Sequence, residues 1–286
     1  RKPGAVRFNG GMNYRHAYHA GNFADVMKHT ALVAVLLHLR KKQAPFAVID
    51  THAGRGLYDL SGTEAGKTGE ARQGIASLGD APAGNEVLQT YLDTARSFGS
   101  ATYPGSPLIA ARLLRPQDRL VAIEKHPEEC EALTTALKPF HKTRAVCADG
   151  YERLAALLPP PERRGAILID PPFEAPDEFA QMADALGNAL RRFATGIYLL
   201  WFPIKTKSDA DALSGEVLAR GATKLLRLQL DVGASAEGRL TQTGLLIVNP
   251  PYGFDAQMRE ALSALAAPLG RGRPAQWSVE WLAGEG

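Results

Sequence analysis

Cysteine is scarce in this sequence, which has only Cys130 and Cys147 among its 286 residues. Two cysteines are too few for the disulfide framework of a small secreted protein, and the N-terminus lacks the basic, apolar and cleavable segments of a signal peptide. Long hydrophobic runs are also missing. The longest, residues 30–39, is interrupted by His38 and is much shorter than the roughly 20 residues that cross a bilayer. We therefore expect a protein of the reducing cytoplasm without a membrane partner.

Charge of one sign is not in large excess, because 33 lysines and arginines face 30 aspartates and glutamates, for a net charge of +3. This balance permits a polyanionic partner but does not require one. Hydrophobic residues (45%) and charged residues (22%) are near the globular average, which excludes a disordered, collagen-like or coiled-coil chain. No histidine or cysteine spacing matches a metal-binding motif, so we expect no bound metal.

The sequence pattern divides the chain into three parts. Residues 1–11 are glycine-rich and non-periodic, and we interpret them as a tag or a loose extension outside the fold. Residues 12–45 hold an N-terminal active-site segment and then a helix over 22–42, where apolar residues recur at helical spacing. Residues 46–286 form the main domain. Within it, residues 57–102 are predicted to be a small helical insertion, with a helix near 86–98, that covers the site.

Four short apolar runs in the main domain end at or near acidic residues. These runs are 46–49, 120–123, 144–147 and 165–169, and the acidic residues are Asp50, Glu124, Asp149 and Asp170. Helical segments separate the runs, which predicts a doubly wound α/β sheet, and such sheets bind ligands beyond the carboxyl ends of their strands. Later apolar runs predict a strand over 196–202, an antiparallel hairpin of 224–232 and 244–248, and an edge strand over 277–282.

A glycine turn follows the first predicted strand, in the order Asp50-Thr51-His52-Ala53-Gly54-Arg55-Gly56. Glycines let the backbone approach a ligand without an intervening Cβ. A dinucleotide motif would need a further glycine where Asp59 stands. The acidic-x-Gly-x-Gly-x-Gly pattern of S-adenosylmethionine sites is matched at Asp50, Gly54 and Gly56, with His52 in the first glycine position.

Two further carboxylates follow predicted strands at positions suited to a nucleoside. Glu124 can accept hydrogen bonds from both hydroxyls of a ribose, although a surface acid is an equally good interpretation. Asp149, which precedes Gly150, can accept from an adenine amino group or can cap the helix that begins near Tyr151. We favour the ligand role for Asp149 and Gly150.

The most specific signal is Asp170-Pro171-Pro172-Phe173 at the end of the fourth strand. Two prolines fix the backbone and carry no N–H, so the Asp170 carboxylate and the Pro171 carbonyl can face a planar amine such as adenine N6. The Phe173 ring can stack on the base, a contact worth ~1–3 kcal/mol in comparable sites. A second copy, Asn249-Pro250-Pro251-Tyr252, follows a late hairpin strand. We favour the Asp170 copy because its strand lies beside the glycine turn.

These motifs carry a family resemblance. The chain resembles the bacterial 23S ribosomal RNA adenine-N6 methyltransferases with an Asp-Pro-Pro-Tyr/Phe motif, earlier described as proteins of external-DNA catabolism. The resemblance runs from about Met12 to Leu282. It rests on Tyr14-Arg15-His16-Ala17-Tyr18-His19-Ala20-Gly21-Asn22, Asp25, Lys28-His29, Asp50-Thr51-His52-Ala53-Gly54, Tyr103-Pro104-Gly105-Ser106-Pro107 and the Asp170 motif.

The resemblance implies a Rossmann-like, class I S-adenosylmethionine-dependent methyltransferase that acts on 23S ribosomal RNA. It implies that Tyr14 and His16 lie over the active site and contact the RNA, and that Lys28 and His29 reach the cofactor. Ser106, Glu124 and Asp149 would complete the cofactor site. The family usually has tyrosine where this chain has Phe173, so a stacking contact is kept but a hydroxyl contact is not.

The implied reaction is direct displacement, in which N6 of a flipped adenine attacks the sulfonium methyl while Asp170 and the Pro171 carbonyl orient the amine. We expect a monomer. The alternatives are an adenine-N6 methyltransferase of DNA, a methyltransferase of a protein glutamine amide, and a non-enzymatic nucleic-acid-binding protein of external-DNA utilisation. The last would bind without cofactor and with steep salt dependence.

Overall fold

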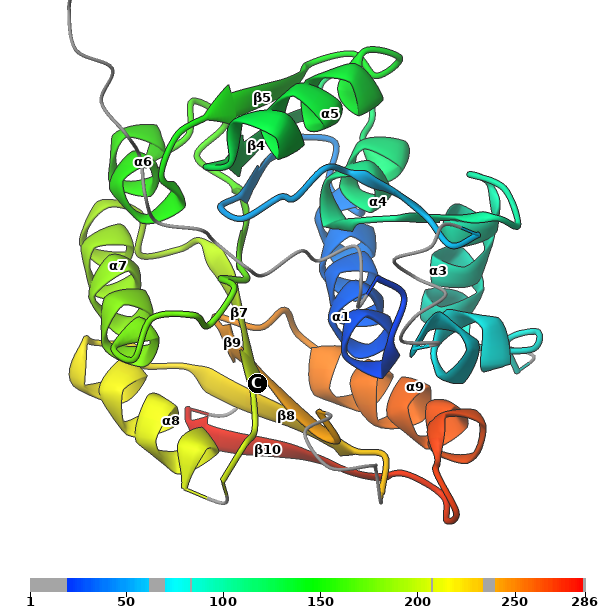
Figure 1. The fold of residues 1–286 in the computed structure, drawn as a ribbon. Helices are drawn as coiled ribbons and strands as arrows, with labels where there is room; N and C mark the ends of the chain where they lie inside the picture. Colours follow the sequence, from blue (N-terminus) through cyan, green and yellow to red (C-terminus); the bar gives the residue numbers. More distant parts are fainter. Residues whose placement is uncertain (1–19, 62–69, 83, 207, 234–239, 285–286) are drawn as a thin grey trace, which may run out of the picture.

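The computed structural model describes residues 20–61, 70–82, 84–206, 208–233 and 240–284. Figure 1 traces the chain through these parts. The predicted extension over residues 1–11 and the proposed RNA contacts Tyr14 and His16 lie outside the described residues.

The core is an eight-stranded sheet in the order β10-β8-β9-β7-β6-β1-β4-β5. Its strands are β1 (Ala47–Asp50), β4 (Arg119–Glu124), β5 (Thr143–Cys147), β6 (Gly165–Ile169), β7 (Ile197–Pro203), β8 (Leu225–Asp231), β9 (Gln242–Val248) and β10 (Gln276–Ala283). Strands β5, β4, β1, β6 and β7 are parallel, whereas β9 is antiparallel to β7 and β8, and β10 is antiparallel to β8. The predicted doubly wound α/β sheet, its hairpin and its edge strand are confirmed.

Helices cover both faces of this sheet (Figure 1). One core contains side chains of α1 (Phe23–Arg40), α3 (Glu86–Arg96), α4 (Ser106–Leu113), α5 (Pro127–Leu137) and α9 (Phe254–Leu269). The other contains side chains of α6 (Gly150–Leu157), α7 (Glu178–Arg192) and α8 (Asp209–Ala219). Because helices shield both faces, the central strands β1 and β6 are buried along their whole length, as expected of parallel strands.

Helix α1 matches the predicted helix and is buried on nearly all sides. The Asn22 side chain caps it by accepting a hydrogen bond from the Asp25 N–H at 3.0 Å. Its core residues include Val26, Met27 and Leu32, which are at most 1% exposed. Two charged side chains, Asp25 and Lys28, are also buried. A buried charge is costly without a partner, so these two residues need specific neighbours.

The predicted insertion contains the expected helix, α3, together with a two-stranded sheet that the pattern did not reveal. Its short strands are β2 (Leu57–Asp59) and β3 (Thr102–Pro104), which pair antiparallel, and its 3-10 turns are Glu70–Gln73 and Ile75–Ser77. Helix α3 packs into the same core as α1 through Val87, Leu88 and Tyr91. The proposal that this insertion covers the site stays a prediction.

Two further observations concern the whole chain. Within the parts of the chain that the structure describes, no helix is long and apolar enough to cross a membrane. Cys130 and Cys147, which the sequence did not suggest as a pair, form a disulfide between α5 and the end of β5. Stable disulfides are rare in the reducing cytoplasm that the sequence predicts for this chain.

Candidate active site

A cavity of about 430 Å³ opens at the carboxyl ends of the parallel strands, which is the edge where ligands of doubly wound sheets bind. Its volume falls in the usual range for small-molecule sites, about 300–1,000 Å³. Nine of the residues selected from sequence line it: Lys28, His29, His52, Gly54, Ser106, Glu124, Asp149, Asp170 and Pro171.

The glycine turn and Glu124 hold each other in place. The Gly54 N–H donates to Glu124 Oε2 at 2.9 Å, and the His126 N–H donates to Oε1 at 2.7 Å. Gly54 has φ of +60°, and a Cβ at this position would lie 2.1 Å from the Tyr58 hydroxyl. A side chain at residue 54 would therefore be strained and would have to displace the Tyr58 ring. Burial raises the pKa of Glu124 above its ordinary value, but each carboxylate oxygen keeps a lone pair for a further donor.

His52 occupies the first glycine position of the turn and is neutral near pH 7. Burial lowers its pKa to about 4, against the opposing effect of Asp170 and Asp149. Its ring lies edge-on to Tyr151, with 4.9 Å between the ring centroids, and its Nδ1 lies 2.8 Å from Thr51 Oγ1. This histidine therefore presents an uncharged ring to the cavity.

Asp149 is the N-cap of α6, one of the two roles considered from sequence. Its Oδ1 accepts from the Tyr151 N–H at 3.0 Å and the Glu152 N–H at 3.2 Å, and its Oδ2 lies 2.9 Å from Lys125 Nζ. Although burial opposes the shift, these donors lower the pKa of Asp149. The cap does not exclude a ligand contact, because Asp149 also lines the cavity. Its contact with an adenine amino group stays a prediction.

The Asp170 carboxylate is paired with a buried cation. Lys28 Nζ lies 2.5 Å from Asp170 Oδ2 and 2.8 Å from Asp25 Oδ1. Burial alone would lower the pKa of Lys28, but Asp170 and Asp25 raise it, so the ammonium stays charged. The ion pair involves Asp170 Oδ2, which leaves Oδ1 to accept a hydrogen bond from a substrate amine.

Asp50 lies behind the cavity wall rather than in it. It is 1% exposed, and Oδ2 accepts from the Ser106 hydroxyl at 2.6 Å. Burial raises the pKa of Asp50 to about 7, with a further contribution from nearby Asp170. Asp50 is therefore placed to influence the cavity through Ser106, which lines it, and through its own charge.

His29 belongs to a buried hydrogen-bonded chain of rings. Its Nδ1 lies 2.6 Å from the Tyr103 hydroxyl, which lies 3.0 Å from the Tyr91 hydroxyl. Burial raises the pKa of both tyrosines, so both are neutral near pH 7. This chain joins α1 to the insertion and holds the His29 ring at the cavity.

Three further predicted site residues, Gly56, Gly150 and Phe173, are not among the residues that line the cavity. A Cβ on Gly56 would meet Ala136 and Leu133 of α5 at 3.3 Å, and a Cβ on Gly150 would lie 2.0 Å from the Thr51 carbonyl oxygen. These two glycines therefore serve close packing of the backbone. The Phe173 ring lies edge-on to Phe179 and Trp201, with ring centroids 5.4 and 5.6 Å away.

The second Pro-Pro motif lies at the opposite end of the strands from the cavity. Strand β9 runs antiparallel to β7, and Val248 pairs with Tyr198 near the start of β7. The carboxyl end of β9 therefore meets the amino ends of the parallel strands. The Asn249 amide donates to the carbonyls of Ala194 and Gly196, both at 2.8 Å. This motif therefore differs from the Asp170 motif in the direction of the strand that precedes it, as well as in the position of that strand in the sheet.

Several cavity residues were missed by the sequence reasoning. Tyr58, Lys125, His126 and Tyr151 all line the cavity. Tyr151 directly follows Asp149-Gly150, and Lys125 and His126 directly follow Glu124, so nearness to predicted residues was the available signal. Trp201 does not line the cavity, but it lies beside Lys28 and was not selected from the sequence either. Its Nε1 is buried without a hydrogen-bond partner among the described residues, and Lys28 Nζ lies 5.7 Å from its ring centroid.

The charge of the cavity fits a cationic nucleoside ligand. Two lysines line it, Lys28 and Lys125, against seven acidic residues: Glu124, Glu128, Glu129, Asp149, Asp170, Glu174 and Glu178. Such an excess of carboxylates favours a ligand of positive charge. The Glu124 carboxylate borders this space, and its predicted contact with a ribose stays a prediction. Within the described residues, no group of three or more histidine, cysteine or acidic side chains could hold a metal ion.

Comparison with known proteins agrees with this geometry. The family model described as ribosomal RNA large subunit methyltransferase D, RlmJ, matches residues 43–283. A protein of Haemophilus influenzae called ribosomal RNA large subunit methyltransferase J is 37% identical over 280 residues, which cover 96% of this chain and 100% of the relative. A protein of Escherichia coli with the same name is 37% identical over 282 residues, with the same coverage.

A solved structure extends the likeness to three dimensions. The crystal structure of protein LPL1258 from Legionella pneumophila has a TM-score of 0.82 and 34% sequence identity, and the match covers 92% of this chain and 98% of that chain. The likeness therefore includes the sheet and the helices on both of its faces. By sequence and by fold, this chain belongs to the family of ribosomal RNA large subunit methyltransferases described as RlmJ.

Proposed function

We propose that this chain transfers a methyl group from S-adenosylmethionine to N6 of an adenine in 23S ribosomal RNA. The observation that carries the proposal is the placement of Asp170-Pro171 at the cavity, next to the glycine turn and Glu124. The relatives named above are ribosomal RNA methyltransferases, and this substrate would place the enzyme in the cytoplasm.

The cavity residues would hold the cofactor through charge and hydrogen bonding. Glu124 is placed to accept from the ribose hydroxyls, and Asp149 or the backbone near it from the adenine amino group. The acidic wall favours the positive charge, and Lys28 and His29 border the same space. When bound, S-adenosylmethionine supplies an electrophilic methyl group on a sulfonium.

Asp170 would orient the target amine and receive its proton. Lys28 holds the carboxylate through Oδ2, so Oδ1 can accept a hydrogen bond from N6 without rotation of the side chain. A second acceptor, the Pro171 carbonyl, would restrict the amine to one orientation. In this arrangement the N6 lone pair would form the new N–C bond as the sulfonium C–S bond breaks, and Asp170 would take the N6 proton. Preorganised acceptors of this kind lower the barrier mainly through positioning.

The test is transfer of labelled methyl from S-adenosylmethionine to 23S ribosomal RNA that lacks its modifications. We expect label on adenine N6, identified by mass spectrometry of nucleosides after digestion. Asp170→Ala should reduce the rate by about 100-fold or more. Asn249→Ala should keep the wild-type rate, because Asn249 lies at the opposite edge of the sheet.

The other outcomes identify the alternatives. Transfer to adenine in DNA or to a protein glutamine amide, with none to ribosomal RNA, would keep the reaction class and contradict the substrate. Binding of nucleic acid with no binding of cofactor in calorimetry would contradict the enzymatic function and favour a nucleic-acid-binding protein.

A further inference from the structure

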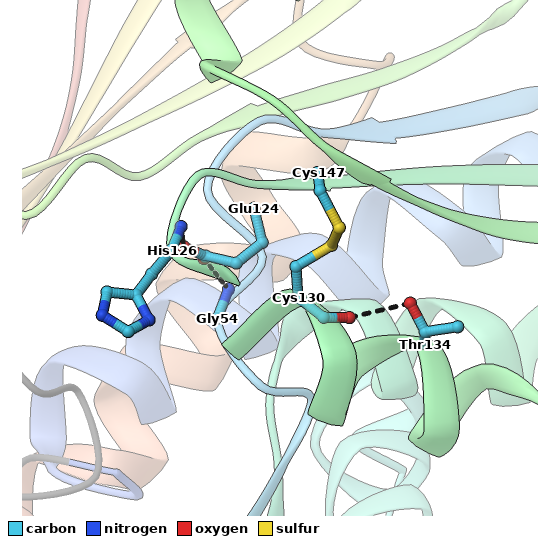
Figure 2. The surroundings of a disulfide bond; sticks show 6 residues. All are labelled: Gly54, Glu124, His126, Cys130, Thr134 and Cys147. Carbon is cyan, nitrogen blue, oxygen red and sulfur yellow. Dashed lines mark hydrogen bonds between the residues drawn. A yellow bond between two sulfur atoms is a disulfide. The ribbon is translucent and has the colours of Figure 1, made fainter. Parts of the chain in front are cut away.

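The disulfide joins α5 to the end of β5 near Glu124 (Figure 2). These two elements border the outer loops of the proposed cofactor site, residues 125–126 and 148–149. Cys130 is on the first turns of α5 and is fully buried, whereas Cys147 is the exposed last residue of β5. In the loop between Glu124 and α5, the His126 N–H donates to the Glu124 carboxylate. Two residues after Cys147 comes Asp149. The bond therefore links the ribose side of the cavity to its adenine side.

The sheet register brings the disulfide close to Glu124. Cys147 is the partner of Glu124 in the pairing of β5 with β4, and the Cys130 N–H donates to the His126 carbonyl at 2.9 Å. His126 in turn donates its N–H to Glu124 Oε1. One covalent bond thus connects to Glu124 along two short paths, through the strand pair and through the start of α5.

The other links between these two loops are weak. Lys125 pairs with Asp149, but the Lys125 side chain is 63% exposed, and exposed ion pairs contribute little. The Ala148 N–H donates to the Glu124 carbonyl at 3.1 Å. β5 is the edge strand of the sheet, so it has one neighbour instead of two. The ladder between β5 and β4 ends at the Glu124–Cys147 pair. Beyond it, the Ala148–Glu124 hydrogen bond, the Lys125–Asp149 pair and the disulfide hold the outer loops together.

We propose that Cys130 and Cys147 are a redox-dependent positioning pair for the cofactor. Their disulfide holds Glu124 and Asp149 at a spacing that favours the adenosine moiety, and the dithiol form, which a reducing cytoplasm favours, binds the cofactor more weakly. Reduction by a dithiol breaks the S–S bond, adds two electrons and two protons to form two thiols, and oxidises the dithiol to its own disulfide. The loops can then separate, and preorganisation of the site is lost. The proposal rests on the proposed use of S-adenosylmethionine.

The first experiment compares cofactor binding in the two redox states. Thiol alkylation and mass spectrometry establish the state of the purified chain before and after dithiothreitol. Calorimetry then measures the dissociation constant for S-adenosylmethionine. We expect reduction to raise it about threefold to tenfold, while kcat at saturating cofactor and KM for RNA stay unchanged. A bond that only stabilised the fold would lower Tm without this selective change.

Variants separate loss of the bond from general damage. Cys147→Ser removes the exposed sulfur, and Cys130→Ala/Cys147→Ala removes both. Each should bind cofactor as weakly as the reduced wild type and should not respond to dithiothreitol. A second readout follows from thermodynamic linkage. If reduction weakens cofactor binding by some factor, saturating cofactor must make the disulfide harder to reduce by the same factor.

The possible results distinguish this inference from the proposed function. Equal cofactor affinity in both redox states, or the absence of a disulfide in the oxidised chain, would overturn the positioning role alone. The absence of cofactor binding in either state would contradict the proposed function itself.

Discussion

The chemistry of single residues centres on a buried cluster in which one ammonium serves two carboxylates. Lys28 contacts Asp25 and Asp170, and Asp50 is buried nearby with Ser106 as its hydrogen-bond donor. The cluster already holds more negative than positive charge, and ionisation of Asp50 adds to this excess. A bound cation would therefore favour the ionised form of Asp50.

Cofactor affinity should depend on pH through Asp50. Burial raises the pKa of Asp50 to about 7 in the protein without ligand, and a bound sulfonium would lower it. Binding then releases a proton, so affinity should increase by about threefold to tenfold from pH 6 to pH 8. Calorimetry across this range provides the measurement.

Two variants isolate the contribution of Asp50. The amino group of the cofactor also titrates near pH 8, but it does so equally in Asp50→Asn, which should lack the Asp50 part of the pH dependence. Ser106→Ala removes a donor that lowers the pKa of Asp50, so its profile should move to higher pH. Identical pH profiles in wild type and Asp50→Asn would contradict this prediction.

At the scale of elements, the site depends on a close approach between α6 and the turn after β1. Gly150 begins α6, and its backbone is so near Thr51 that a Cβ would lie 2.0 Å from the carbonyl oxygen. The N-terminus of α6, with its N-cap Asp149, therefore packs directly against the glycine turn. Any added atom at residue 150 must separate the two walls of the cavity.

Gly150→Ala should reduce both stability and cofactor affinity. Forcing the Cβ into this contact costs about 1–3 kcal/mol in the free energy of unfolding, measured by urea denaturation. Gly215→Ala in α8 is the matched control, because a Cβ there meets nothing within 4 Å. Removal of a helix-interior glycine should stabilise the protein by about 0.5–1 kcal/mol. Equal effects of the two variants would show that the close approach is unimportant.

On the scale of the whole molecule, an ionic cluster ties the end of α1 to the sheet at the edge remote from the site. Asp118 is fully buried and accepts hydrogen bonds from Arg115 and from the Phe46 N–H. Arg115 also donates to the carbonyls of Arg40, Lys42 and Ala44. Helix α1 runs from this cluster to Lys28 and the cavity, so it connects the two ends of the parallel strands.

Arg115→Ala should destabilise the fold without changing the chemistry. It leaves the Asp118 carboxylate buried without its cation, and we expect a loss of about 2–4 kcal/mol in the free energy of unfolding. Arg96→Ala is the control, since its partner Asp80 is 92% exposed, and should cost less than about 1 kcal/mol. Activity below the unfolding transition should match wild type. Methyl-transfer assays and thermal unfolding of both variants check these expectations.

The pH dependence of this loss follows from Asp118. Although burial opposes the shift, hydrogen bonds from Arg115 and from the Phe46 N–H lower the pKa of Asp118 below 3.8. The depressed pKa contributes stability above about pH 4 that disappears as the pH falls through the folded-state pKa. The difference between wild type and Arg115→Ala should therefore decrease in acid.

Local sequence patterns are sufficient to predict the sheet and the strand ends at which the site lies. Fully apolar runs such as residues 165–169 predict buried parallel strands, and carboxylates at their ends must meet at one edge. Local patterns of this kind depend only on neighbours along the chain. The glycine turn, Glu124, Asp149 and Asp170 could therefore all be selected before the structure was known.

Contacts between distant segments, in contrast, are visible only in the folded chain. Lys28 and Asp170 are 142 residues apart in sequence, and no periodicity relates them. The reversal of β9 sends Asn249 to the remote edge, because antiparallel pairing inverts which end of a strand faces the site. The pairing of Cys130 with Cys147 likewise depends on how α5 packs on β5. Such contacts follow from packing of whole elements, which the local pattern of residues does not encode.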